Sequence, residues 1–319
     1  MSEDVQLGGG GFAARESALW RLRTRSLALG GRTLLMGVVN VTYDSFSDGG
    51  KYLETDAAVG QALRLLNDGA DVIDLGAEST RPGSHAGSAD AAVSADEEQA
   101  RLTPVIEGIR AARPDAVISV DTYKAATARA ALEAGAEIIN DVSGFLWDAQ
   151  MAGVCAEARC GVVLMHTRGK PEAWATQEQL SGDALVSVVR DGLAASMKTA
   201  EDAGVAREAI VLDPGYGFGK RHGENFALLA RQRQLLALGR PLLAGVSRKS
   251  FLGRALAPLY GGVDVPVDAR ETAGVAAMVA AILNGASIVR VHEVKAAREA
   301  ARIADHCMER GTCGAADAR

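Results

Sequence analysis

The residues that could do chemistry in this 319-residue chain stand at the ends of short apolar runs. Eight such runs recur along the sequence, and each leads into side chains that carry charge or form hydrogen bonds. Any one of these residues could be an ordinary loop or cap residue, because strand ends are normally polar. Eight ends that all carry such groups instead indicate one site at which they converge. They are Asn40, the stretch 78–83, Asp121, Asn140 with Asp141, His166, Asp213, the stretch 247–250, and Arg290 with His292.

Basic side chains gather after the last two runs. Arg248 and Lys249 follow the seventh run, and Arg290 and His292 follow the eighth. Arginine and lysine donate charge-assisted hydrogen bonds to phosphate oxygens. This group therefore predicts a binding site for a phosphate or a diphosphate.

Acidic and amide side chains follow the third, fourth and sixth runs, at Asp121, Asn140 and Asp213. A buried carboxylate is costly unless it meets hydrogen-bond donors, and a flat heterocycle with ring N–H and exocyclic amino groups supplies them. Two aspartates could instead form a general acid–base pair. The spread over three strands suits a planar ligand across a barrel mouth better. With the basic group, it indicates a diphosphate ester of an amino-substituted heterocycle as the substrate.

The elements that must position these residues predict a TIM (β/α)8 barrel. From Arg32 onward the chain repeats an apolar strand, a polar loop and an amphipathic helix, and eight such units is the count of that fold. An open, doubly wound sheet is the alternative, but its G-x-G-x-x-G turn follows none of the runs. GYGFGK at 215–220 has the wrong spacing for a Walker A sequence. The expected strands are 34–39, 71–75, 116–120, 136–139, 161–165, 209–212, 241–246 and 287–291, and the expected helices are 56–68, 95–112, 124–134, 148–159, 180–204, 224–238, 270–284 and 294–309.

The residues before the barrel predict a flexible N-terminal arm, to about residue 25, followed by a β-hairpin. Residues 26–29 and 32–35 would pair across a turn at Gly30 and Gly31. The expected domains are an arm and part of the hairpin over 1–31, a single barrel domain over 32–310, and a tail over 311–319. The polar stretch from Asn40 to Gly50 is expected to be a loop, because its composition cannot build a core.

Composition excludes several classes of protein. A net charge of -6 argues against a nucleic-acid binder, and no apolar stretch is long enough to span a membrane. The four cysteines form no Cys-x-x-Cys pair, and the N-terminus lacks a secretory pattern. We expect reduced thiols in a cytoplasmic protein.

The chain resembles the dihydropteroate synthase family of pterin-binding TIM-barrel enzymes over residues 33 to 308. The resemblance rests on MGVVNVTYDSFSDGG, DLGAESTRPGS, SVDTYK, INDVSG, LMH, LDPGYGFGK, GVSRKSFLG and SIVRVH, in that order. In that family, (7,8-dihydropterin-6-yl)methyl diphosphate is joined to 4-aminobenzoate with release of diphosphate, in folate biosynthesis. The resemblance also implies Mg2+ as the cofactor and a homodimer, through helices around 270–308.

The resemblance implies a role for each matching residue. The pterin ring would be held by Asp121, Asn140, Asp213 and Lys249, and the diphosphate by Thr80, Arg81, Arg290 and His292. The 4-aminobenzoate site would be formed by Phe46, Pro82, Phe218 and Ser247. Asn40 would bind the Mg2+ on the diphosphate, and Asp48 would stabilise a developing pterin cation. The residues implied in catalysis are therefore Asp48, Lys249, Arg290 and His292.

Chemistry agrees with an SN1-like route. Loss of diphosphate leaves a methylene cation conjugated with the pterin, and the basic residues and Mg2+ stabilise the leaving anion. The neutral arylamine then attacks, so no general base is assigned. Two other interpretations stay open: a methyltetrahydrofolate-type methyltransferase, which has no use for the diphosphate group, and a non-catalytic paralogue.

One residue departs from the family pattern. Tyr43 stands where the family usually has proline, and proline would restrict the backbone of the open loop. Neutral drift in an exposed loop is one explanation. The functional hypothesis is a costlier loop closure and a higher KM for 4-aminobenzoate.

Overall fold

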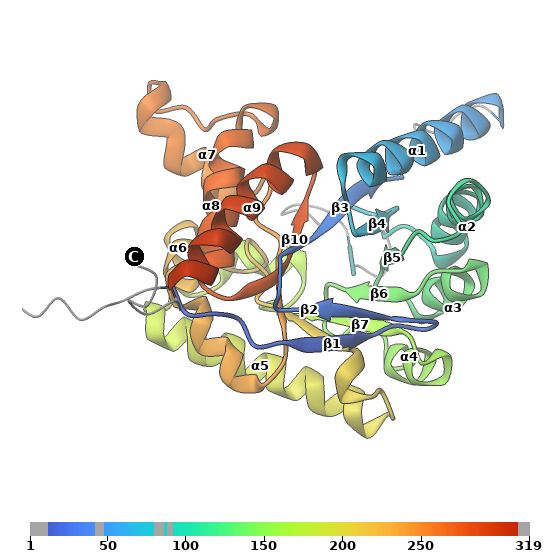
Figure 1. Ribbon diagram of the computed structural model, residues 1–319, viewed down its shortest axis with the longest axis horizontal. Helices are drawn as coiled ribbons and strands as arrows, with labels where there is room; N and C mark the ends of the chain where they lie inside the picture. Colours follow the sequence, from blue (N-terminus) through green and yellow to red (C-terminus); the bar gives the residue numbers. More distant parts are fainter. Residues whose placement is uncertain (1–11, 42–47, 80–85, 88–91, 312–319) are drawn as a thin grey trace, which may run out of the picture.

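A closed barrel of parallel strands forms the centre of the molecule, which is a computed structural model (Figure 1). The structure describes residues 12–41, 48–79, 86–87 and 92–311. Around the barrel the strands follow the order β10-β3-β4-β5-β6-β7-β8-β9. They are β3 Leu34–Asn40, β4 Val72–Gly76, β5 Ile118–Asp121, β6 Ile138–Asp141, β7 Gly161–Met165, β8 Ile210–Asp213, β9 Leu242–Ala244 and β10 Ala286–Val291. The predicted TIM barrel is confirmed.

Helices surround the barrel, as Figure 1 shows. They are α1 Asp48–Asp68, α2 Ala95–Ala112, α3 Ala125–Ala134, α4 Met151–Ala158, α5 Gly182–Asp202, α6 His222–Arg231, α7 Ser250–Leu256, α8 Glu271–Leu283 and α9 Val294–Gly311. Short 3-10 turns are η1 Pro171–Thr176, η2 Arg207–Ala209, η3 Gln232–Leu238, η4 Ala257–Tyr260 and η5 Val267–Ala269.

Three helical predictions need correction. α1 begins at Asp48 rather than 56, so Gly49 and Gly50 belong to a helix and not to the loop. The expected helix 224–238 is α6 followed by the 3-10 turn η3. α7 was not predicted, because its seven residues are too few to show a helical period.

Successive residues of each barrel strand face opposite sides, as strand geometry requires. On β4, Val72 belongs to the cluster inside the barrel, whereas Ile73 and Leu75 belong to the cluster between the strands and the helices. Asp74 therefore faces inward, one layer above Val72. The same alternation on β6 places Ile138 inside and Ile139 outside.

The N-terminal hairpin is present, but its strands differ from the predicted ones. β1 Ala18–Arg21 pairs antiparallel with β2 Ser26–Leu29, and residues 34–40 enter the barrel instead. Residues 18–21 are thus a strand and not part of a flexible arm, and Trp20 is fully buried. Gly30 and Gly31 link the hairpin to β3 rather than turning it, and Gly30 has a φ of +98°, which favours glycine.

The hairpin closes the N-terminal end of the barrel. Trp20, Leu22 and Leu29 pack in one cluster with the lower inward side chains of the barrel strands. The indole Nε1 of Trp20 donates to the carbonyl oxygen of Ala209 at 2.8 Å, so even this polar atom is satisfied. Residues 18–29 therefore pack as part of the barrel core.

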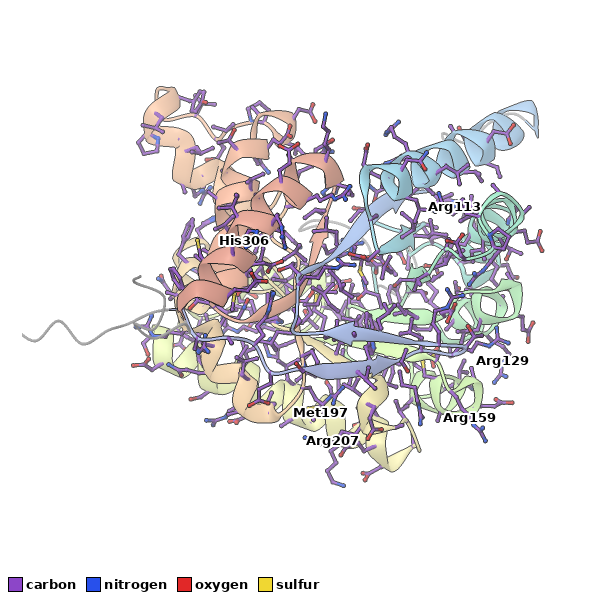
Figure 2. The ribbon with its side chains drawn as sticks, viewed as in Figure 1. Arg113, Arg129, Arg159, Met197, Arg207 and His306 are labelled. Atoms are coloured by element: carbon purple, nitrogen blue, oxygen red, sulfur yellow. The ribbon has the colours of Figure 1, made fainter. Side chains whose placement is uncertain are left out.

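Charged side chains cover the outer surface. Arg129 and Arg207 lie at the edge of the molecule in Figure 2, where they pair with Glu157 at 3.0 Å and with Glu201 at 2.7 Å. Such exposed pairs contribute little to stability. In the part of the chain that the structure describes, no helix is long and apolar enough to cross a membrane.

Candidate active site

A cavity of about 520 Å³ opens at the carboxyl ends of the barrel strands, where this fold places its active sites. It gathers most of the predicted site residues from strands and loops far apart in the sequence. Those that line it are Asn40, Asp121, Asn140, Asp213, Phe218, Ser247, Lys249, Arg290 and His292. The sequence prediction that these residues converge is confirmed.

The hydrogen-bond acceptors lie deepest. Asn140 and Asp213 are buried, and Asp121 is partly exposed. Alternation explains the depth, because Ile138 and Val211 occupy the inward positions one layer below Asn140 and Asp213. Val38, Val142 and Met165 also line the cavity and supply apolar walls for a flat ring.

Burial disfavours the charge of both aspartates. Burial raises the pKa of Asp213 above its ordinary value, although the backbone N–H of Gly215 donates to Oδ1 at 2.7 Å. Burial raises the pKa of Asp121 to about 7; the charge of Asp74 adds to this rise and the Arg290 guanidinium opposes it. A ligand that donates hydrogen bonds to these carboxyl groups would offset the cost of their burial.

Arg290 lies between two carboxylates rather than free at a phosphate corner. Its Nε donates to Asp74 Oδ2 at 2.6 Å, and its Nη2 donates to Asp121 Oδ2 at 2.8 Å. Burial acts to lower the pKa of Arg290, but the two carboxylates outweigh it and the net change is upward. Arg290 therefore links the acceptor group to the basic group. Asp74 was not among the predicted site residues.

The other basic residues have separate surroundings. His292 Nδ1 and Ser247 Oγ are 3.0 Å apart, and this contact helps to orient the imidazole ring at the cavity wall. Lys249 Nζ lies 3.9 Å from the centre of the Phe218 ring, a cation–π contact in the same cavity. Arg248 donates to Glu293 at 2.7 Å, so part of the predicted basic group is neutralised by a neighbouring carboxylate.

The loop after β8 positions Phe218. Gly215, Gly217 and Gly219 all have positive φ, and a Cβ on Gly215 would collide with the carbonyl oxygen of His166. The repeated glycines of GYGFGK thus serve a tight loop and not a nucleotide site. Phe218 packs edge to face on Trp174, with ring centres 5.2 Å apart.

His166 supports this loop from below instead of lining the cavity. The Nζ of Lys220 donates to the His166 carbonyl oxygen at 2.8 Å and lies 2.9 Å from Nδ1. Burial lowers the pKa of His166 to about 2, and it holds the pKa of Lys220 well below its ordinary value. The neutral imidazole accepts a hydrogen bond here, so His166 is a packing residue among the eight strand-end groups.

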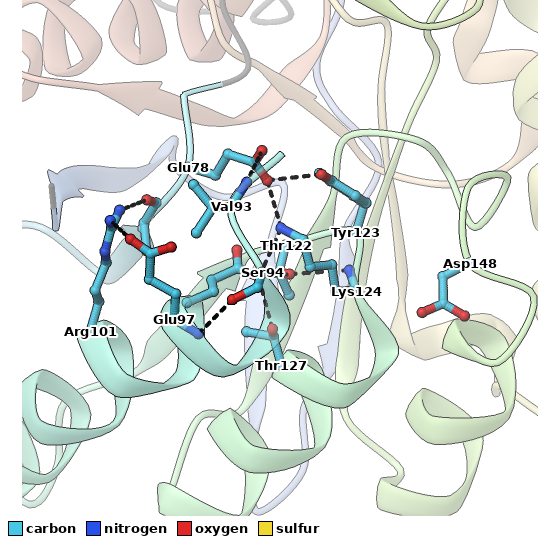
Figure 3. Close-up of polar contacts among 12 residues, drawn as sticks. Glu78, Val93, Ser94, Glu97, Arg101, Thr122, Tyr123, Lys124, Thr127 and Asp148 are labelled. Atoms are coloured by element: carbon cyan, nitrogen blue, oxygen red, sulfur yellow. Dashed lines mark hydrogen bonds and ion pairs between the residues drawn. The ribbon is translucent and has the colours of Figure 1, made fainter. Parts of the chain in front are cut away.

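Glu78, just after β4, accepts hydrogen bonds from two other segments of the chain, as Figure 3 shows. Its carboxylate accepts from the backbone N–H of Val93 at 3.1 Å, from the Tyr123 hydroxyl at 2.9 Å and from Lys124 Nζ at 2.6 Å. The Tyr123 oxygen in turn accepts from the backbone N–H of Gly87 at 2.9 Å. These bonds tie Gly87 and Val93 to Tyr123 and to the end of β4.

The positions of five predicted site residues cannot be described. Phe46, Thr80, Arg81 and Pro82 lie outside the described residues, and nothing is described of the Asp48 side chain. Tyr43, the residue that departs from the family pattern, also lies outside the described residues. Their roles stay predictions.

The donor set fits a magnesium ion only together with a substrate. The described residues contain no group of three His, Cys, Asp or Glu side chains that could hold a metal ion. Asn40 ends β3 with an exposed side chain in the cavity. Mg2+ keeps several waters and often binds through one or two protein ligands plus substrate phosphates. One amide oxygen facing a diphosphate site is compatible with that mode.

Comparison with known proteins identifies the family. The sequence pattern described as "Pterin binding enzyme" matches residues 36–292. The dihydropteroate synthase of Bacillus subtilis is 42% identical over 280 residues, which are 88% of this chain and 90% of that protein. The chain belongs to the dihydropteroate synthase family.

Solved dihydropteroate synthases share the fold as well. The enzyme from Clostridium difficile, solved in the presence of pteroic acid, has a TM-score of 0.76 and 39% identity, covering 87% of this chain and 97% of that one. The enzyme from Xanthomonas albilineans, solved with 4-aminobenzoic acid, also has a TM-score of 0.76 and 39% identity, covering 90% of this chain and 97% of that one. The resemblance inferred from the motifs is confirmed.

Proposed function

We propose that the barrel mouth carries out dihydropteroate synthesis, an alkyl or aryl transfer. The enzyme joins (7,8-dihydropterin-6-yl)methyl diphosphate to 4-aminobenzoate and releases diphosphate, in folate biosynthesis. The observation that carries this function is the convergence of Asp121, Asn140 and Asp213 beside Lys249 and Arg290 in one cavity. Relatives solved with pteroic acid and with 4-aminobenzoic acid support the two substrates.

Asp121, Asn140 and Asp213 accept hydrogen bonds from the ring N–H and amino groups of the pterin. The burial of Asn140 and Asp213 supports this role, because a ligand with donors would add hydrogen bonds to oxygens that are largely withdrawn from water. Lys249 donates to the ring from the side of Phe218. The apolar residues of the cavity wall cover the ring faces.

The diphosphate lies toward His292 and the outer edge of Arg290. Two of the three guanidinium nitrogens already donate to Asp74 and Asp121, so Nη1 is the one that turns to an anion. The imidazole of His292, oriented by Ser247, provides a second donor. Thr80 and Arg81 complete this site.

Reaction begins when the carbon–oxygen bond to the diphosphate breaks and the diphosphate leaves with the electron pair. The methylene cation that remains is conjugated with the pterin, and Asp48 stabilises it. The arylamine nitrogen then forms the new C–N bond and loses one proton. Phe46, Pro82, Phe218 and Ser247 hold the aminobenzoate and keep water away, because water would capture the cation.

Asn40 would hold Mg2+ together with the substrate diphosphate. When bound, the ion supplies charge that stabilises the leaving diphosphate. The end position of Asn40 on β3 and its exposure to the cavity support this assignment.

The enzyme acts as a cytoplasmic homodimer. The described cysteines Cys155, Cys160 and Cys307 are free thiols, which supports a reducing compartment. The contact that we propose runs through helices around 270–308, where Ile303 on α9 exposes 65% of its surface. A single species of monomer mass in sedimentation velocity would contradict the dimer.

The test measures diphosphate release from the dihydropterin substrate with Mg2+, with and without 4-aminobenzoate, together with chromatography for dihydropteroate. Dihydropteroate formation that depends on both substrates supports the function. Diphosphate release without dihydropteroate would locate a defect in the aminobenzoate site. Pterin binding without any release would favour a non-catalytic paralogue or a methyltransferase.

A further inference from the structure

Asp74 is a buried charge that the reaction above does not use. It stands in the middle of β4, an otherwise apolar strand, and none of its surface is exposed. It is not among the described residues that line the cavity, so it does not touch the substrate. A carboxylate in such a place is costly unless several donors surround it.

Three donors surround the carboxylate, each from a different strand. Ser119 Oγ on β5 donates to Oδ1 at 2.6 Å. Asn140 Nδ2 on β6 donates to Oδ2 at 3.1 Å, and Arg290 Nε on β10 donates to the same oxygen at 2.6 Å. Two of the three partners therefore line the cavity, where they face the pterin and the diphosphate.

An ionised carboxylate only accepts hydrogen bonds, and this fixes the orientation of the Asn140 amide. An asparagine side chain carries a donating and an accepting end, and Asp74 takes the donating end. Oδ1 of Asn140 and at most one amide hydrogen are left for a ligand. The same contact fixes Arg290 so that its Nη2 reaches Asp121 at 2.8 Å.

We infer that Asp74 is a positioning residue that sets the polarity of the pterin site. By holding Asn140 with its carbonyl oxygen toward the ligand, beside the carboxyl groups of Asp121 and Asp213, it makes the site select a heterocycle edge that donates hydrogen bonds. This inference rests on the proposed function and adds a residue that acts through two others.

The central test is Asp74→Leu, which keeps the approximate size and removes both carboxylate oxygens. Asn140 Nδ2 and Arg290 Nε then lose the oxygen that accepts from both, so nothing on β4 holds the Asn140 amide with its oxygen toward the ligand. KM for the pterin diphosphate and Kd for pteroic acid should rise by roughly 10- to 100-fold, because an unpaired buried group costs that much. KM for 4-aminobenzoate should change less than about threefold.

Two further variants separate positioning from general damage. Ser119→Ala removes the third donor but leaves Asn140 and Arg290 in place, so both KM values should stay within about threefold of the parent. Asp74→Asn is the matched control, because an amide oxygen in the place of Oδ2 still accepts from Asn140 and Arg290 while the NH2 group faces the Ser119 hydroxyl, which can accept. Asp74→Asn should bind pteroic acid at least about threefold more tightly than Asp74→Leu.

Asp74→Leu with an unchanged Kd for pteroic acid would overturn the inference, as would equal losses in Ser119→Ala. Equal losses in Asp74→Asn and Asp74→Leu would also overturn it. If Asp74→Leu does not fold, Asp74→Ala takes its place, with the same expected rise in Kd for pteroic acid and the same outcomes against the inference. A parent that binds pteroic acid without making dihydropteroate would refute the proposed function and not this inference.

Discussion

The two ends of the barrel use the same strands and opposite kinds of side chain. At the N-terminal end, the inward residues Val72, Ile138 and Val211 pack with Trp20 of the hairpin. One layer above, the inward residues of the same three strands are Asp74, Asn140 and Asp213. On each of the three strands, the inward residue therefore changes from apolar to polar within two positions of the chain.

The apolar layer serves the stability of the barrel, whereas the polar layer forms the cavity. The lower layer buries apolar surface, the main favourable contribution to folding, and the hairpin excludes water from it. The upper layer buries carboxyl groups whose pKa values are raised by burial, as for Asp121 and Asp213. Charge held there costs stability, and under the proposed function it is retained to bind the pterin. Changes at the two ends should therefore have separable effects.

Trp20→Ala should give the largest effect, on stability. Removing this fully buried indole should lower the free energy of unfolding by about 3–5 kcal/mol. Activity per folded molecule should remain near the parent value, because Trp20 lies at the end opposite to the cavity. Urea unfolding and active-site titration measure the two quantities.

Trp20→Phe is the matched control. It keeps most of the ring and loses the hydrogen bond to Ala209, which should cost about 1 kcal/mol. A loss of activity in the folded fraction of either variant would show that the two ends are coupled.

Asp213→Asn should have the next largest effect, on catalysis. It replaces the carboxylate that we propose accepts hydrogen bonds from the pterin by an amide, and kcat/KM for the pterin diphosphate should fall by about 100-fold or more. Tm should stay level or rise, since a buried carboxyl group with a raised pKa is removed. Asp202→Asn, at an exposed position on α5, is the control and should change neither value.

The pH dependence of stability sharpens the comparison. The pKa of Asp121 is raised from 3.8 to about 7 in the folded protein. The folded state therefore binds this proton more tightly than the unfolded chain, and its stabilising contribution is complete below pH 3.8 and is lost as the pH rises through about 7.

The variant Asp121→Asn has no titrating group at this position, so its stability does not fall through this mechanism as the pH rises. Its Tm relative to the parent should thus increase between about pH 4 and pH 8, which scanning calorimetry in matched buffers can measure. A relative Tm that stays level over this range would mean that the pKa of Asp121 is not raised in the folded protein.

Tyr123→Phe should have a smaller effect, confined to the rim of the mouth. It removes the hydroxyl that donates to Glu78 and accepts from Gly87. Residues 79–92 include Thr80 and Arg81, which we assign to the diphosphate, and Pro82, which we assign to 4-aminobenzoate, so both KM values should rise about fivefold. Steady-state kinetics with each substrate varied in turn tests this, and unchanged KM values would show that Tyr123 does not position these residues.

The smallest effect is expected from Tyr43→Pro, which restores the residue usual in the family. Restricting the open loop should lower KM for 4-aminobenzoate by about two- to fivefold, through reduced conformational entropy. An unchanged KM would assign Tyr43 to neutral drift. Stability should be nearly the same in both proteins.

The sequence by itself determined the barrel and the convergence of nine predicted residues at its mouth. Strand alternation and strand ends are local properties, so the apolar runs located each barrel strand within a few residues. The polar residues that followed them, such as Asn140 and Asp213, were correctly expected to converge. Hairpin strands were misplaced because the true first strand, residues 18–21, is short and has only one fully buried residue.

Only the tertiary structure decided which of these side chains meet. In the sequence, Asp74 is a single charge within an apolar strand, and this is the only sequence feature that could have indicated its role. Its pairing with Arg290 joins residues 216 positions apart. Such a contact depends on closure of the barrel between β10 and β3 and on the stagger of its strands. Those quantities are set by the packing of the whole chain, whereas the identity of each inward residue is set by its own strand.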